Sequence, residues 1–138
     1  MSTIIPFYAE DSAYFQQGRN LTMTDFTIYH NPRCSKSRQT LALLEENNIS
    51  PQIILYLETP PSKSALTDLL AKLGVSPRDL IRTSEDAYRQ ANLSDKSLSD
   101  DQLLDAMIAE PKLIQRPVVV SGDRAVIGRP PENVLALL

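Results

Sequence analysis

The order of the predicted elements makes this chain an α/β protein with a mixed four-stranded sheet. Residues 26–57 show a strand–helix–strand pattern, residues 60–111 show only helical patterns, and residues 117–138 show a hairpin followed by a helix. A strand–helix–strand unit of this length makes parallel strands, whereas a hairpin makes antiparallel ones. The sequence therefore predicts a helical insert between a βαβ half and a ββα half.

The βαβ half begins with a short apolar run, residues 26–29, which predicts a strand. A helical pattern follows over residues 35–47, with Leu41 and Leu44 among its inward positions. Residues 53–57 are apolar without interruption, which is typical of a strand that is buried on both faces. These three elements complete the predicted parallel unit.

Four helical segments are expected in the insert. The first, residues 64–73, carries leucines on one face and stops at Gly74. A serine, a proline and an aspartate with helix-start spacing predict a short helix over residues 76–82. A further turn or two is expected over residues 84–90, and residues 99–109 begin with a capping box. We expect these helices to pack beside the sheet.

The end of the chain predicts a hairpin and a last helix. Residues 117–120 and 124–127 are short apolar runs, and Gly122-Asp123 between them supplies the turn. The helix opens at Pro130. The resulting order of βαβ, helices and ββα is a thioredoxin-like topology.

One domain accounts for most of the chain. Its 138 residues suffice for a single core, and two independent domains are not expected. Residues 1–22 show no clear period, so we expect an N-terminal arm that is disordered or outside the fold, with the domain spanning residues 23–138. Met23 is then a candidate functional start.

Charge and composition exclude several classes of protein. The net charge of −3 gives no general attraction to nucleic acid or acidic membranes, so any anion must be bound by local arginines. The single cysteine excludes an internal disulfide and fits a reducing compartment. There is neither an apolar run that could span a bilayer, nor a secretory signal, nor a cysteine–histidine cluster with metal spacing. We expect a soluble, cytoplasmic protein without a metal.

Cys34 is the main candidate for a reactive residue. It lies where the strand of residues 26–29 turns into the following helix. The free N–H groups at a helix start favour a thiolate and seat an anion. Arg33, Lys36 and Arg38 crowd this helix start against the preference of the helix dipole, which marks a candidate functional site. We predict a nucleophile beside an anion site; the alternative is a small buried structural thiol.

The surroundings of this cysteine restrict its chemistry. Ser37 holds the place of the second thiol in a CxxC pair, so the chain cannot form the disulfide of a dithiol oxidoreductase. Cys34 then needs a bound oxyanion to attack or an external thiol to resolve it. His30, the sole histidine, has a modest expected role in keeping Cys34 ionised through the local network.

Two arginines are candidates for binding the oxyanion. Arg116 and Arg129 each precede a proline, which holds its predecessor extended and projects the guanidinium from a stiff point. Their planar forks fit a tetrahedral oxyanion, although surface arginines without function are the alternative. Arg116-Pro117 is also a candidate cis peptide. Arg82 looks like a surface arginine on pattern alone.

Five motifs in order resemble one family over about residues 24–138. They are His30-Asn31-Pro32-x-Cys34-x-x-Ser37-Arg38, Tyr56-Leu57-Glu58-Thr59-Pro60-Pro61, Leu80-Ile81-Arg82, Arg116-Pro117-Val118-Val119 and Gly128-Arg129-Pro130. With these motifs the chain resembles a shorter branch of the glutaredoxin-linked arsenate reductase family.

The resemblance implies a role for each matching residue. Cys34 matches the nucleophile, and Arg82, Arg116 and Arg129 match the arginines that hold the oxyanion, which promotes Arg82 from a surface residue. The residues that support the thiolate would be His30, Ser37 and Arg38.

The implied activity is the reduction of arsenate to arsenite in arsenic detoxification. Cys34 would form a cysteinyl arsenate, glutathione as co-substrate would attack the arsenic, and glutaredoxin would remove the glutathione. No bound cofactor, nucleic acid or membrane is implied. Two alternatives stay open: a non-enzymatic RNA polymerase-binding regulator of the same superfamily, and a glutathione-dependent thiol transferase.

Overall fold

The computed structural model describes residues 25–138, so the expected arm over residues 1–22 and the candidate start at Met23 lie outside the described residues. The strands are β1 (Phe26–Tyr29), β2 (Gln52–Ile54), β3 (Val118–Ser121) and β4 (Arg124–Ile127). Their order in the sheet is β2–β1–β3–β4, with β1 parallel to β2 and the other neighbours antiparallel. The predicted mixed four-stranded sheet is confirmed.

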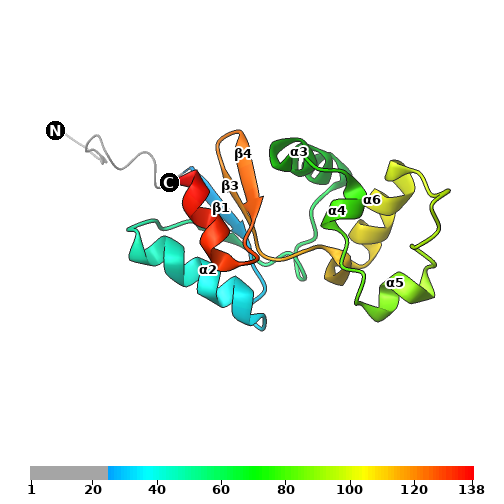
Figure 1. The fold of residues 1–138 in the computed structure, drawn as a ribbon, viewed down its shortest axis with the longest axis horizontal. Helices are drawn as coiled ribbons and strands as arrows, with labels where there is room; N and C mark the ends of the chain where they lie inside the picture. The colour runs from blue at the N-terminus through cyan, green and yellow to red at the C-terminus, as the bar shows by residue number, and fades with distance from the viewer. Residues whose placement is uncertain (1–24) are drawn as a thin grey trace.

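Helices cover both faces of this sheet. They are α2 (Ser35–Glu46), α3 (Lys63–Leu73), α4 (Pro77–Leu80), α5 (Asp86–Gln90), α6 (Asp100–Ala109) and the 3-10 helices η1 (Pro111–Leu113) and η2 (Pro131–Leu137). In Figure 1, α2 and η2 lie on one side of the sheet, and α3 begins the helical insert on the other side. No helix of residues 25–138 is long and apolar enough to cross a membrane.

The sheet divides the apolar core into two clusters. Neighbouring residues of β3 point to opposite faces, as the two-residue period of a strand requires. Val118 belongs to the cluster under α3 and α6, whereas Val119 belongs to the cluster under α2 and η2, and both side chains are fully buried. A slip of one residue would exchange these two faces, so the packing fixes the register of the hairpin.

The strand expected over residues 53–57 is present and parallel to β1, but its predicted length and its burial on both faces are wrong. The observed strand β2 covers three residues and forms an edge of the sheet, and Ile53 and Leu57 are 47% and 40% exposed. An edge strand has a neighbour on one side only, so an apolar run there need not be buried. The chain leaves the sheet after Ile54, and the Tyr56 side chain enters the core with 1% exposure.

The hairpin brings the two arginine–proline pairs to one end of the sheet. Gly122 adopts a φ of +61° at the first turn position, which a glycine allows without strain. Arg116 precedes β3 and Arg129 follows β4, and the Gly128 N–H donates to the Pro117 carbonyl at 2.9 Å. Arg116-Pro117 is cis, as predicted, and Arg129-Pro130 is cis as well.

The packing of this end of the hairpin against α2 can be tested at Gly128, where a side chain has no room. A Cβ at this position would lie 2.6 Å from Thr40 Oγ1 and 2.9 Å from Pro117 Cγ. We expect Gly128→Ala to lower the free energy of unfolding by about 1–3 kcal/mol, because the site is already filled. Denaturant unfolding measures this change.

The Thr40→Ala variant provides the matched control. Because Thr40 is the main obstacle, the double variant Thr40→Ala/Gly128→Ala should lose less stability than the sum of the two single changes. Strictly additive losses would contradict a direct contact between the two positions.

Candidate active site

Cys34 occupies the N-cap position of α2. A turn joins it to β1, in which the Cys34 N–H donates to the Asn31 carbonyl at 3.0 Å. The side chain makes no capping hydrogen bond, but the backbone N–H groups of Ser37 and Lys36 lie close enough to the sulfur to favour a thiolate, at the position where a serine or aspartate oxygen usually caps a helix. The first turn of α2 contains no acidic residue, and its positive end is therefore left for the sulfur.

These contacts shift the thiol toward its ionised form. Burial raises the pKa of the Cys34 thiol, because a thiolate loses water there. The N–H groups of Ser37 and Lys36 and the guanidinium of Arg116 act in the opposite direction and outweigh burial. The pKa of Cys34 is therefore lowered from its ordinary value, and the side chain remains partly exposed. A sulfur of this kind ionises more readily than an ordinary thiol and is reachable.

Arg116 and Arg129 meet beside the sulfur. The Arg129 guanidinium donates from Nη1 to Cys34 Sγ at 3.7 Å and to the Arg116 carbonyl at 3.2 Å. The positive charge of Arg116 lies close enough to the same sulfur to lower the pKa of the thiol. The hairpin thus places two guanidinium groups near the start of α2.

Arg82 reaches this site from the helical insert. An isolated bridge between Ile81 and Ile114 joins the end of α4 to the segment before β3, and the Arg82 N–H donates to the Leu113 carbonyl at 2.7 Å. This pairing places Arg82 on a strand-like segment next to the one that carries Arg116.

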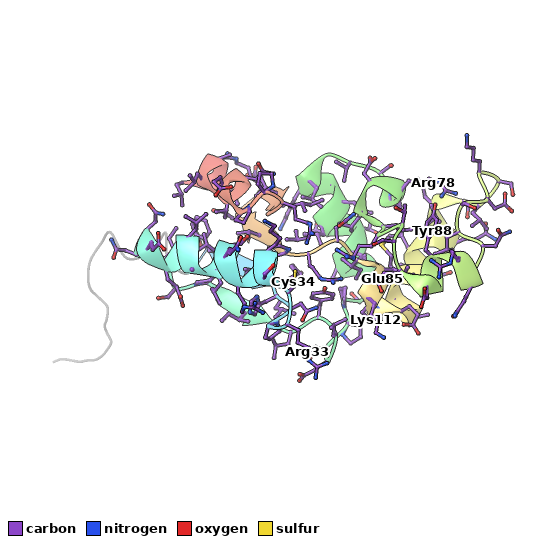
Figure 2. The ribbon with its side chains drawn as sticks, turned by 60° about the horizontal axis from the view of Figure 1, so that its bottom comes forward. Arg33, Cys34, Arg78, Glu85, Tyr88 and Lys112 are labelled. Atoms are coloured by element: carbon purple, nitrogen blue, oxygen red, sulfur yellow. The ribbon has the colours of Figure 1, made fainter. Side chains whose placement is uncertain are left out.

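A carboxylate links these two arginines. Glu85 Oε2 lies 3.3 Å from Arg82 Nε and 3.9 Å from Arg116 Nη1. The three side chains are largely buried, with 24%, 16% and 17% exposure in that order. Figure 2 shows Cys34 at the end of α2 nearest the insert, with Glu85 on the side of the insert that faces it. The site therefore contains a carboxylate as well as cations.

The three residues predicted to support the thiolate lie around the loop before α2. His30 Nδ1 and Ser37 Oγ are 2.6 Å apart in the interior, and the Asn31 N–H donates to the same hydroxyl at 3.0 Å. Burial lowers the pKa of His30, and the positive charge of Arg38 adds to this effect. The histidine is thus disposed to be neutral, and it contacts the side chain of Ser37, whose backbone N–H favours the Cys34 thiolate. The Arg38 guanidinium donates to the Pro32 carbonyl at 2.8 Å and ties the loop to the helix.

Sequence reasoning missed two side chains of this site. Glu85 has a weak local signal, since it lies three residues after Arg82, a spacing that favours ion pairs. Tyr56 was assigned to a strand, although its motif is part of the family resemblance. Its hydroxyl and Arg116 Nε are buried without a hydrogen-bond partner among the described residues. Burial raises the pKa of Tyr56. The positive charges of Arg116 and Arg82 lower it and the neighbouring Cys34 raises it, and the resulting pKa lies above the ordinary value.

No group of three or more histidine, cysteine, aspartate or glutamate side chains within residues 25–138 is placed to hold a metal ion. What the site offers is a nucleophilic sulfur, several guanidinium donors and one carboxylate. That combination suits a covalent attack on a bound oxyanion.

The lowered pKa of Cys34 predicts how alkylation depends on pH. Because only the thiolate reacts, the rate of iodoacetamide alkylation should level off at a lower pH than for an ordinary thiol. Arg116→Met should move the inflection upward, since it removes a charge that stabilises the thiolate. Arg89→Met removes an equal charge from an exposed pair with Asp86 and should leave the inflection in place. An inflection at the ordinary thiol pKa in the unmodified protein would contradict this description.

The chain matches known proteins over nearly all of its described part. Residues 29–137 match the model of the ArsC family. The protein named Uncharacterized protein YfgD of Escherichia coli (strain K12) is 55% identical over 112 residues, 80% of this chain and 94% of its own.

Relatives with a named activity cover similar shares of the chain. An arsenate reductase of Neisseria meningitidis serogroup A is 44% identical over 117 residues, 84% of this chain and 100% of its own. The solved structure of an arsenate reductase from Vibrio cholerae superposes with a TM-score of 0.81 at 54% identity, over 82% of this chain and 97% of that one. The thioredoxin-like fold is thereby confirmed, and the chain belongs to the ArsC family.

Proposed function

We propose that this protein reduces arsenate to arsenite, with the Cys34 thiolate as nucleophile and with glutathione and a glutaredoxin as external thiols. The observation that carries the proposal is a thiol whose pKa is lowered in part by Arg116 and whose sulfur accepts a hydrogen bond from Arg129. The names of the Neisseria and Vibrio relatives support arsenate as the substrate.

The first step of the proposed reaction forms a sulfur–arsenic bond. Cys34 Sγ attacks the arsenic of a bound arsenate, and one oxygen leaves as hydroxide, or as water once it is protonated. Arsenic is still pentavalent in this cysteinyl arsenate. Arg82, Arg116 and Arg129 donate hydrogen bonds to the remaining oxygens, whose negative charge is greatest at the transition state.

The later steps need thiols from outside the chain. Glutathione attacks the arsenic and displaces a second oxygen as water, which leaves arsenic bonded to two sulfurs. A glutaredoxin thiolate then attacks the glutathione sulfur, and the electron pair of the broken sulfur–arsenic bond reduces arsenic to the trivalent state. Hydrolysis releases arsenite and the Cys34 thiol. The single cysteine supports this dependence, because Ser37 holds the place of a second thiol.

A coupled assay tests the proposal. NADPH consumption is followed with glutathione reductase, glutathione, glutaredoxin and arsenate present. Cys34→Ser should abolish turnover because it removes the nucleophile. Arg116→Lys should raise the KM for arsenate about 10-fold, because a lysine cannot replace the forked hydrogen bonds of a guanidinium.

Two controls make the assay decisive. Arg89→Lys exchanges the same residue types at an exposed position and should leave turnover unchanged. Release of glutathione from a glutathionylated peptide, measured without arsenate, detects the thiol transferase alternative. Arsenate reduction by Cys34→Ser at the normal rate would rule out the proposed chemistry.

A further inference from the structure

Glu85 is an unexpected residue in a site built to attract anions. Its carboxylate lies between two of the predicted oxyanion-binding arginines, 3.3 Å from Arg82 Nε and 3.9 Å from Arg116 Nη1. Each arginine therefore already contacts one negative oxygen before any substrate binds. A fixed negative charge at this point weakens the attraction for every anion to some extent.

The Glu85 carboxylate does not cancel the positive charge of this cluster. Three guanidinium groups are opposed by the Glu85 carboxylate and the Cys34 thiolate, so the cluster holds about one surplus positive charge when both are ionised. The neighbouring acid, Asp86, pairs with exposed Arg89 instead and leaves this cluster alone. Among residues 25–138, Glu85 is thus the acidic residue whose side chain pairs with both Arg82 and Arg116.

A carboxylate differs from the rest of the site in the direction of its hydrogen bonds. The arginines only donate, whereas an ionised carboxylate only accepts. Both arginine contacts end on Oε2, so Oε1 has the capacity to accept a further hydrogen bond. The side chain is 24% exposed, which leaves it accessible to a bound molecule.

We propose that Glu85 determines which oxyanions the site accepts: its carboxylate takes a hydrogen bond from a protonated oxygen of a tetrahedral anion held by Arg82, Arg116 and Arg129. This inference rests on the proposed function, since it concerns the same anion site. Arsenate and phosphate keep at least one proton at neutral pH, so they satisfy the carboxylate with a short charge-assisted hydrogen bond. Sulfate carries no proton there and turns bare oxygens toward Glu85, where like charges repel.

Protection of Cys34 from alkylation measures this preference without turnover. Phosphate or sulfate is added at constant ionic strength, because general screening would otherwise weaken the arginine contacts. The concentration that halves the iodoacetamide rate is then recorded for each anion. Each rate is normalised to the rate without anion, which removes any effect of a variant on the thiol itself.

The unmodified protein should require about 10-fold less phosphate than sulfate for half-protection, from one hydrogen bond gained and one repulsion avoided. Glu85→Gln keeps the shape of the side chain, removes the charge and adds an N–H donor. In this variant sulfate should protect nearly as well as phosphate. Asp86→Asn makes the same change of charge one residue further along and should keep the original preference.

The outcomes separate this inference from the proposed reaction. An equal effect of the two anions on the unmodified protein, or an unchanged preference in Glu85→Gln, would overturn the role of Glu85 even where arsenate is turned over. A preference that disappears only in Glu85→Gln, in a protein that does not reduce arsenate, would support selection by Glu85 and remove the proposed activity. Thermal unfolding of both variants verifies that each is folded.

Discussion

The placement of the Cys34 sulfur at the N-cap of α2, close to the first N–H groups of the helix, is the constraint on which the site depends. The N-cap residues of α3, α4 and α6 are Ser62, Ser76 and Ser99, whereas the N-cap of α2 is Cys34. A neutral thiol is a poor helix cap, whereas a thiolate is a good one. The Cys34 side chain makes no capping hydrogen bond and the first turn of α2 has no acidic residue, so the N–H groups and the positive end of the helix are available to stabilise a thiolate.

The hairpin performs the complementary task of holding two cations near that sulfur. In an antiparallel pair, the residue before the first strand and the residue after the second lie at the same end. Arg116 and Arg129 occupy these positions, and Gly128 lets this end approach Thr40 of α2 closely. The guanidinium groups are thus positioned by backbone pairing and packing, which spares much of the entropy that loose surface arginines lose on binding.

Local pattern was enough to predict the βαβ unit, the hairpin, the capped helices and the position of Cys34 at a helix start. It failed at residues 53–57, because a run of apolar residues does not tell an edge strand from a central one. It also left Arg82 on the surface, since the Arg82–Leu113 backbone bond joins segments 31 residues apart and has no local signature. Only the family motif pointed to Arg82, and Glu85 beside it was missed.

Arg116 contacts two negative groups, and this bears on how the proposed reaction would proceed. The thiolate and the Glu85 carboxylate share its charge while the sulfur is ionised. Once sulfur bonds to arsenic, the sulfur loses its negative charge, and the arsenate oxygens become the anions nearest the guanidinium. Its hydrogen bonds can then strengthen as charge moves from sulfur to oxygen, which is the difference between ground state and transition state that accelerates a reaction. A carboxylate that stays in place on Arg82 and Arg116 keeps both side chains oriented throughout this transfer, so Glu85 would serve orientation and selection by the same contacts.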